Sequence, residues 1–406
     1  IQVMKETGKI LMLCLLMMIA ACGKEEIGVG KRPAADGGWR NPSFSIDTTE
    51  NARKRCYVTG LDYQDGYDWR PDTEKGTVKC SLVVFADGVP AMKVAVGDEY
   101  LVSPDPDMHR VIKGHLYTDF STDDETVIKK DGREIFRYAG REMILGMSVS
   151  DGDVYTLGKP RSGDGFSFRK NGEAVLERSS GSPFPRLQDT DGVISFAFSE
   201  MIQDADDMIE RYYQYADGDV RQIAVREDVR KVWDVMMHEG RTCYLADMVG
   251  ISVPVLVSGS GMKTMELTSG MRLVTCRLIP AGKSVIVEAI YSSNGTFLSS
   301  GLWKDGARHM LFGAGMTVGG ICTSDDGVSC VLNSKYSGGG GTIFRCGETF
   351  TMPQGYICMG SNPLAMMDGI LHVGLTSVRG GKPVIWMDGK TQELDINGCI
   401  CTLTVQ

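Results

Sequence analysis

Positive charge is scarce in this chain of 406 residues. Its 43 Lys and Arg are outnumbered by 52 Asp and Glu, so the formal net charge is −9 at pH 7. A protein that binds nucleic acid neutralises phosphates with a basic surface. We therefore expect no nucleic-acid partner.

Histidine is also scarce, and long apolar runs are missing. None of the five His has the HExxH spacing of a zinc site, and we expect all of them on second strands or near turns. They are His109, His115, His238, His309 and His372. The apolar run Ile10–Ala20 is too short to cross a bilayer. No metal site is predicted.

Complete catalytic motifs are absent. Residues 280–285 (PAGKSV) resemble the end of a P-loop, but Arg277 stands where the motif requires Gly. Residues 258–261 (SGSG) lack the spacing of a nucleophile elbow. No catalytic residue is predicted, and a non-enzymatic protein is favoured. A carboxylate pair for glycoside hydrolysis is a three-dimensional property that no local pattern nominates.

Three acidic clusters offer oxygen ligands of the kind that Ca²⁺ prefers. They lie at 122–125 (TDDE), 189–192 (DTDG) and 204–207 (DADD). None completes an EF-hand-like loop, and solvated turn carboxylates are the ordinary explanation. A Ca²⁺ ion stays an open alternative, and no other cofactor is predicted.

The first residues carry the most specific signal in the chain. Lys5 and Lys9 precede the apolar run Ile10–Ala20, as in a signal peptide. Residues 19–22 (IAAC) then resemble the lipobox of bacterial lipoproteins. The resemblance implies cleavage before Cys22 and lipidation of its thiol, which makes membrane lipid a partner. An ordinary secretory cleavage site is the alternative.

Three segments follow from this start. Residues 1–21 are expected to be the signal peptide, 22–53 a flexible tether and 54–406 the folded body. Lys24-Glu25-Glu26 resembles the acidic tag that sends Bacteroidota lipoproteins to the cell surface. The expected location is therefore the outer membrane, with the periplasmic leaflet as the alternative to surface exposure.

A two-residue hairpin turn recurs along the folded body. Asp-Gly and Asn-Gly favour type I′ turns, which need positive φ at both residues. The turns are Asp87-Gly88, Asp131-Gly132, Asn171-Gly172, Asp217-Gly218, Ser260-Gly261, Asp305-Gly306, Cys346-Gly347 and Asp388-Gly389. Their glycines are 40 to 46 residues apart, which indicates a repeated structural unit.

A second set of turns lies midway between the first. It comprises Asp151-Gly152, Asp191-Gly192, Glu239-Gly240, Ala281-Gly282, Asp326-Gly327 and Asp368-Gly369, with residues 103–107 (SPDPD) in that place in the first repeat, after a strand expected near 98–103. Two hairpins per repeat give four antiparallel strands, the blade of a β-propeller.

The ends of the chain predict how the ring closes. Residues 399–406 (CICTLTVQ) supply a first strand, and the stretches RCYVTGL, KCSLVVF and VPAMKVA near the start supply strands two to four. One shared blade and seven complete repeats give an all-β, eight-bladed propeller. Seven blades is the alternative, with residues 54–90 packed outside the ring.

Trp303 and Trp386 precede two of the hairpin turns and are expected to pack between blades. These hairpins resemble the W-(K/x)-(N/D)-G repeats of uncharacterised β-propeller lipoproteins of Bacteroidota. The resemblance covers residues 54–406 and is degenerate, since two of eight copies keep the Trp. It implies a fold and a compartment and carries no activity.

Two further expectations concern local structure. Residues 200–215 (EMIQDADDMIERYYQY) have a helical pattern but occupy a loop and a strand of the repeat, so we predict no helix. Of twelve Cys, the ten after Cys22 are expected to be mostly buried thiols, with room for one or two disulfides.

The loops that join strands two and three, or successive blades, share one face of a propeller. Aromatic and acidic residues in or beside these loops suit sugar stacking or a protein contact, although loop anchoring is the commoner role of such residues. The candidates are Asp123, Asp124, Tyr212, Tyr213, Trp233, Tyr291 and Tyr336.

The function expected is that of a non-catalytic binding or scaffolding module for a glycan, a peptide or an envelope protein. A polysaccharide hydrolase or lyase with a site at the channel mouth is the alternative.

Overall fold

The fold is seen in a computed structural model. It describes residues 54–63, 80–96, 109–121, 124–160, 163–190, 192–204, 207–259, 261–267, 270–293, 297–313, 315–324, 327–334, 339–360 and 363–406. The expected signal peptide (1–21), Cys22 and the tether (22–53) lie outside these residues, as do Asp123 and Tyr336.

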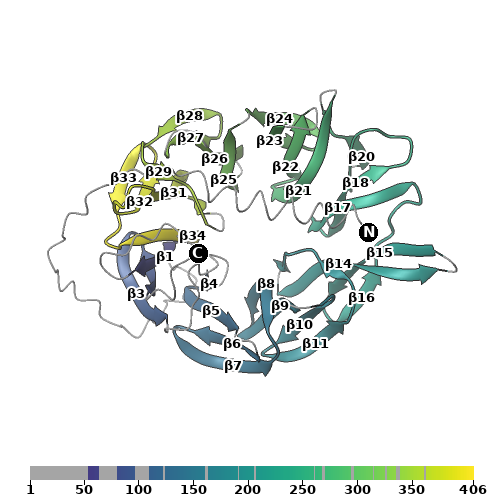
Figure 1. Ribbon diagram of the computed structural model, residues 1–406, viewed down its shortest axis with the longest axis horizontal. Helices are drawn as coiled ribbons and strands as arrows, with labels where there is room; N and C mark the ends of the chain where they lie inside the picture. The colour runs from purple at the N-terminus through teal and green to yellow at the C-terminus, as the bar shows by residue number, and fades with distance from the viewer. Residues whose placement is uncertain are drawn as a thin grey trace.

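Eight antiparallel sheets are arranged in a ring (Figure 1). Blade 1 consists of β34 (Gly398–Val405), β1 (Cys56–Tyr63), β2 (Cys80–Ala86) and β3 (Val89–Val96), and blade 2 of β4 (His109–Ile112), β5 (His115–Ser121), β6 (Glu125–Lys130) and β7 (Arg133–Ala139). Blade 3 consists of β8 (Glu142–Ser150), β9 (Asp153–Pro160), β10 (Phe166–Lys170) and β11 (Glu173–Arg178). Blade 4 consists of β12 (Ser182–Pro183), β13 (Gln188–Thr190), β14 (Val193–Asp204), β15 (Asp207–Ala216) and β16 (Asp219–Gln222).

Blades 5 to 8 continue in chain order. Blade 5 consists of β17 (Val229–His238), β18 (Arg241–Met248), β19 (Val255–Ser258) and β20 (Gly261–Thr264), and blade 6 of β21 (Met271–Ala281), β22 (Ser284–Ser293), β23 (Phe297–Lys304) and β24 (Ala307–Phe312). Blade 7 consists of β25 (Met316–Ser324), β26 (Gly327–Ser334), β27 (Gly341–Arg345) and β28 (Glu348–Met352). Blade 8 consists of β29 (Tyr356–Ile357), β30 (Leu364–Met367), β31 (Ile370–Ser377), β32 (Val384–Met387) and β33 (Lys390–Glu393). In blades 4 and 8 the first strand is split in two.

Blade 1 joins the two ends of the folded body. β34 pairs with β1 along its whole length, from Cys56 opposite Val405 to Asp62 opposite Gly398. The hydroxyls of Thr59 and Thr402 share a buried hydrogen bond of 2.6 Å. The prediction of eight blades closed by the last strand is confirmed.

Three of the predicted turns are shifted by one residue. The register pairs Ala281 with Ser284, Ser258 with Gly261 and Ser324 with Gly327, so that Gly282-Lys283 forms one turn, and Gly261 and Gly327 are strand residues.

Ten of the other predicted turns have positive φ at both residues, as expected. Asp87 and Gly88 have φ of 51° and 75°, and Asp305 and Gly306 have 51° and 85°. A side chain at the second position would be strained there, which is why the repeat keeps Gly.

In blade 2 the predicted first turn is wrong altogether. In blade 2 the first turn is Lys113-Gly114, with φ of 47° and 67°, and not residues 103–107. The first strand is His109–Ile112 and not a strand near 98–103, because the register pairs Ile112 with His115. Lys replaces Asp at the first turn position, so a search for Asp-Gly or Asn-Gly misses this turn.

Apolar side chains between neighbouring blades form the core. Trp303 of β23 is fully buried in a cluster that includes Met236 and Leu245 of blade 5. Trp386 of β32 packs against blade 7, with its ring edge-on to Phe350 at 5.2 Å between centroids. Both Trp lie between blades, as predicted.

Residues 200–215 form no helix, as predicted; β14 and β15 cover most of them. In the part of the chain that the structure describes, no helix has the length and apolarity needed to span a membrane.

The ten cysteines of the folded body are free thiols. Burial raises the pKa of Cys56 to about 12, of Cys330 to about 12 and of Cys80 to about 11. These thiols therefore stay protonated at neutral pH and are poor nucleophiles.

His109 lies on β4, the first strand of blade 2, and not on a second strand, so the expected placement is wrong for this histidine; His309 lies on β24 close to the Asp305-Gly306 turn, as expected. The His109 side chain is 1% exposed, and among the described residues its Nε2 has no hydrogen-bond partner. Burial lowers the pKa of His109 from 6.5 to about 4, and the nearby Arg110 adds to this effect.

We predict that His109 makes the fold sensitive to acid. Above pH 6.5 His109 is neutral in both the folded and the unfolded chain, and the folded state is not penalised. As the pH falls from 6.5 toward 4, the unfolded chain binds a proton at His109 before the folded chain does, so the free energy of unfolding decreases. At pH 5 the loss is about 2 kcal/mol. Urea unfolding at pH 7.5 and pH 5.0 should show a smaller acid loss for His109→Leu than for the unmodified chain. His309→Gln, at an exposed position, should keep the full loss; an unchanged loss in His109→Leu would contradict the prediction.

Candidate functional site

The alternation of strand direction gives the ring two faces. One face carries the turns between strands one and two and between strands three and four; we call it the turn face. The other carries the connections between strands two and three and between blades; we call it the loop face. The five described candidate residues lie in or beside connections of the loop face.

Tyr212 and Tyr291 are buried. The Tyr212 hydroxyl donates to Glu210 Oε2 at 2.6 Å and accepts from the backbone N–H of Val232 in blade 5 at 3.2 Å. Burial raises the pKa of Tyr212, so the hydroxyl stays protonated. The ring of Tyr291 lies edge-on to Trp303 with 5.9 Å between centroids. Both rings anchor the fold, which is the commoner role of such residues.

Tyr213 and Trp233 are half-buried. The ring of Tyr213 stacks on Phe198 with 5.3 Å between centroids. The ammonium of Lys231 lies 3.3 Å from the centre of the Trp233 ring, a cation–π contact. These two aromatic side chains keep part of their surface accessible.

The candidate residues do not form one constellation. Asp124 is exposed, and its backbone carbonyl accepts from the N–H of Gly140 at 2.7 Å. The five described candidates belong to blades 2, 4, 5 and 6. Asp123 and Tyr336 lie outside the described residues.

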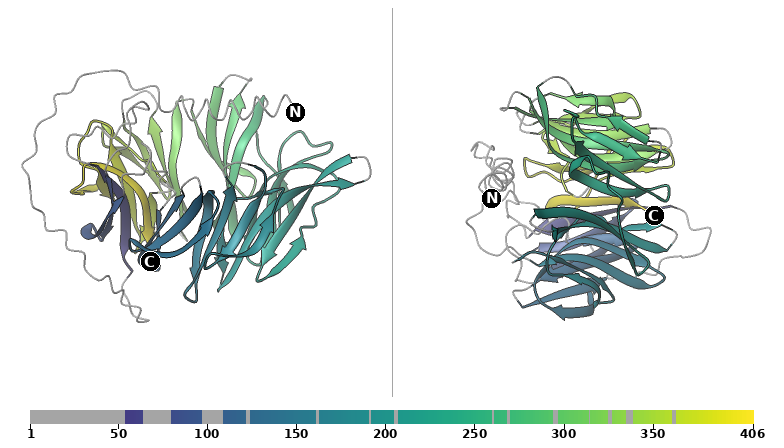
Figure 2. Two further views of the ribbon diagram at one scale, coloured as in Figure 1. Left: turned by 60° about the horizontal axis from the view of Figure 1, so that its bottom comes forward. Right: turned by 90° about the vertical axis from the view of Figure 1, so that its right-hand side faces the viewer.

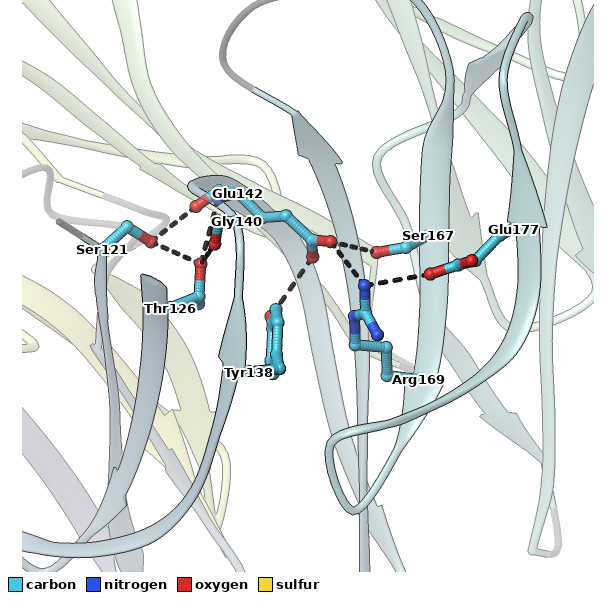
Figure 3. Close-up of polar contacts among 8 residues, drawn as sticks. All are labelled: Ser121, Thr126, Tyr138, Gly140, Glu142, Ser167, Arg169 and Glu177. Atoms are coloured by element: carbon cyan, nitrogen blue, oxygen red, sulfur yellow. Dashed lines mark hydrogen bonds and ion pairs between the residues drawn. The ribbon is translucent and has the colours of Figure 1, made fainter. Parts of the chain in front are cut away.

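A polar network that the sequence did not indicate ties blade 2 to blade 3 near the loop face (Figure 3). Glu142, at the start of β8, is almost buried; its Oε1 accepts from Ser167 Oγ at 2.7 Å and from Arg169 Nη2 at 3.0 Å. Its Oε2 accepts from the hydroxyl of Tyr138 at 3.2 Å. Gly158 leaves room for this carboxylate, because an added Cβ would lie 2.3 Å from Oε2.

Arg169 is the cationic centre of this network. Its guanidinium lies 4.3 Å from the centre of the Tyr138 ring, and the same Nη2 that binds Glu142 also binds Glu177 Oε1 at 3.1 Å. Burial raises the pKa of Tyr138, with Glu142 as the second cause, so Tyr138 acts as a donor. The oxygens of Glu142 are therefore occupied by the protein itself, and the network serves to hold two blades together.

A second network joins the innermost strands of blades 4, 5 and 6. Asp234, at a bulge in β17, accepts from the backbone N–H of Leu278 in β21 at 2.6 Å. Its Oδ2 also pairs with Arg186 Nη2 at 3.2 Å. Like the first network, this one crosses blade boundaries with a buried carboxylate.

The described residues contain no group of three or more His, Cys, Asp or Glu placed to hold a metal ion. Of the acidic clusters, Asp189 caps its own turn by accepting from the N–H of Gly192 at 3.0 Å. Parts of all three clusters lie outside the described residues, so Ca²⁺ binding there stays an open alternative.

Exposed apolar side chains gather on a two-stranded ribbon at the outer end of blade 4. β12 pairs with β14 as far as Ser199, and β16 pairs with β15 from Tyr213 on. Beyond these points β14 and β15 pair only with each other among the described strands, up to Asp204 opposite Asp207. We call residues 200–204 and 207–211 the ribbon; Figures 1 and 2 show it projecting outward from the ring.

The ribbon carries apolar side chains on both faces. Met201 and Met208 lie on one face, and Ile202 and Ile209 lie on the other, because directly paired residues share a face. Met201 is 50% exposed, Met208 59% and Ile209 41%. Residues 200–215 were expected to hold a loop and a strand; their described part belongs to the two strands β14 and β15 instead, because the strands of blade 4 extend past their neighbours.

No protein-family model matches the chain, and no curated protein matches it. Among solved structures, it is similar to the β-propeller domain of the Trilobed protease from Pyrococcus furiosus, described as having an open velcro topology, with 11% identity over 84% of this chain and 95% of that one and a TM-score of 0.43.

Two other solved structures are similar to a comparable degree. The acylaminoacyl peptidase of Pyrococcus horikoshii is 10% identical over 79% of this chain and 56% of that one, with a TM-score of 0.45. The dihydro-heme d1 dehydrogenase NirN in complex with DHE is 10% identical over 86% of this chain and 74% of that one, with a TM-score of 0.48. Similarity at this level carries no inference about activity or ligand.

Arg169 offers a matched pair of substitutions, because it binds one buried and one exposed carboxylate. We predict that Glu142→Ala lowers the free energy of unfolding by about 1.5–3 kcal/mol, since it removes the charged acceptor of the Ser167 and Arg169 hydrogen bonds. Glu177→Ala should lower the free energy of unfolding by less than about 1 kcal/mol, because the side chain of Glu177 is 61% exposed. Urea unfolding of both variants tests this, and equal losses would refute the structural role of Glu142.

Proposed function

We propose that this propeller is a non-catalytic binding module that engages a partner protein through the ribbon of blade 4. The exposed Met201, Met208 and Ile209 carry this proposal, since the folded ring does not need them. Met side chains adapt to irregular apolar surfaces, and exposed apolar side chains gathered on one element are typical of interaction sites.

The charge of the ribbon indicates the kind of partner. Residues 200–211 include five acidic residues and one basic residue. Glu200 pairs with Arg178 Nε of the neighbouring blade at 2.9 Å, and Glu210 accepts from Tyr212. A partner with basic residues around an apolar surface fits this pattern. A second copy of the chain fits it poorly, because both copies carry net negative charge and would repel each other.

The same proposal includes the compartment. We propose that the chain is cleaved before Cys22, anchored by lipid in the outer membrane and exposed at the cell surface. Support comes from Lys5, Lys9, the apolar run Ile10–Ala20 and the IAAC sequence, together with the acidic residues after Cys22. The likeness of the hairpins to those of Bacteroidota propeller lipoproteins agrees with this location.

Lipidation can be tested with two cysteines eight residues apart. The full chain expressed in a bacterium with lipoprotein processing should take up radiolabelled palmitate and enter the membrane fraction. Cys22→Ala should lose both properties, whereas Cys14→Ala, within the expected signal peptide, should keep them. Label retained in Cys22→Ala would overturn the anchor.

Binding by the ribbon can be tested with a photo-crosslinking amino acid at position 208, in cells of the source organism. We predict an adduct with a second protein at 208 and none at position 220, an exposed site on β16 of the same blade. The captured protein, once purified, should bind the unmodified chain and bind Met201→Ser/Met208→Ser at least tenfold more weakly, with both melting temperatures within about 2 °C.

Two results would refute this function. Equal affinity for the unmodified and doubly substituted chains would show that the ribbon is not the contact. An adduct between two copies of the chain would make the ribbon a self-association surface.

A further inference from the structure

An open groove of about 730 Å³ lies between blades 5 and 6. One wall is β20 with the residues after it, and the other is the turn between β23 and β24; Figure 1 shows β20 and β24 on the outer side of the ring. The lining includes Lys263, Thr264, Glu266, Lys304, Arg308 and His309. The volume falls in the range of roughly 300–1,000 Å³ that is usual for small-molecule sites.

The walls of the groove are held by buried contacts. The indole N–H of Trp303 donates to the carbonyl of Glu266 at 3.1 Å, and the N–H of Glu266 donates to the carbonyl of Gly306 at 3.0 Å. Gly306 has a φ of 85°, and an added Cβ would lie 3.1 Å from the Cβ of Lys263. The hairpin of blade 6 therefore sits directly against β20, and the groove is preformed.

Positive charge exceeds negative charge in the groove, because its lining holds three cations, Lys263, Lys304 and Arg308, and two carboxylates, Glu266 and Asp305. Lys263, Lys304 and Arg308 are exposed, and within the described part of the chain none of them forms an ion pair with a carboxylate. The two acidic residues of the lining are already engaged: Glu266 Oε2 accepts from the backbone N–H of Arg308 at 3.0 Å, and Asp305 Oδ1 accepts from the backbone N–H of Val285 at 2.9 Å. This concentration of cations stands out in a chain whose net charge is −9.

The equivalent hairpin of blade 8 shows that the fold does not need these cations. There Met387 and Thr391 occupy the positions of Lys304 and Arg308, counted from the preceding Trp. The turn residue Asp388 pairs with Arg345 Nη1 of blade 7 at 2.9 Å. The two Trp hairpins share their buried anchor and differ in the charge that they present.

The chemistry of the lining selects the ligand. Lys and Arg side chains supply many hydrogen-bond donors, and the guanidinium of Arg308 can bind a carboxylate or sulfate through two bonds. Met262 is the one large apolar side chain of the lining, so a lipid would find little apolar contact. The lining contains no Phe, Tyr or Trp on which a nucleic-acid base could stack. A short ligand that is polar on all sides and carries several negative charges fits this site.

We propose that the groove binds an acidic oligosaccharide and that Lys263, Lys304 and Arg308 hold its carboxylate or sulfate groups. This site lies beside turns of the turn face, whereas the ribbon extends a connection of the loop face. The proposal therefore does not depend on the partner protein of the ribbon.

The test is titration calorimetry of the purified full-length chain with four probes: trigalacturonate, a chondroitin sulfate tetrasaccharide, neutral maltotriose and hexaglutamate. We expect one or both acidic saccharides to bind, and their affinity to fall as NaCl is raised. Because both probes carry carboxylates and only chondroitin sulfate carries sulfates, binding of chondroitin sulfate alone would indicate that the sulfates are recognised. Changing Lys263, Lys304 or Arg308 to Ser should each weaken binding about fivefold or more.

Lys390→Ser is the matched control, because it removes a cation from the equivalent hairpin of blade 8. It should leave the affinity unchanged, and all four variants should melt within about 2 °C of the unmodified chain. Three results would each overturn the proposal. They are binding of maltotriose as tight as that of the acidic saccharides, binding of hexaglutamate as tight as that of the acidic saccharides, and no saccharide binding at concentrations on the order of 10 mM.

Discussion

Closure of the ring by β34 is the constraint on which the rest of the structure depends. A blade buries its flat faces only against its two neighbours, so an open row of blades would leave apolar faces exposed at both ends. The pairing of β34 with β1, with the buried Thr59–Thr402 hydrogen bond, removes those ends. Buried carboxylates reinforce the junctions: Glu142 bonds across blades 2 and 3, and Asp234 across blades 5 and 6.

A ring closed in this way leaves the outer hairpins free to differ. The Asp-Gly turn and its positive φ are kept for backbone reasons, while the residues around the turn are not required by the fold. Trp303 and Trp386 show this separation, since both are buried between blades. Beside Trp386 the turn charge is paired with Arg345, whereas among the residues that the structure describes the cations beside Trp303 form no ion pair. The charged residues around each hairpin can therefore differ from blade to blade and can serve to bind a ligand.

The sequence allowed the number of blades, the closure and the place of both Trp to be predicted, because these follow from turn spacing and from the ends of the chain. Lys113-Gly114 was missed because Lys stands at the first turn position, where the other turns of the repeat mostly have Asp or Asn. Tyr212 and Tyr291 were nominated for their position near loops, but burial depends on register and neighbouring blades. The groove could not be predicted, since Lys263 and Lys304 meet only when consecutive repeats are packed.

The two proposed surfaces have opposite character for a physical reason. The acidic, Met-containing ribbon extends past its blade and gains contact area by projecting, which suits a large partner. The basic groove is formed where two hairpins pack closely, which suits a small ligand held by few groups. The ribbon extends a loop-face connection of blade 4, and the groove lies beside turn-face turns of blades 5 and 6, so the two surfaces are on opposite faces of the ring, and salt screens the field between them. A single chain can therefore bind both ligands without one site neutralising the other.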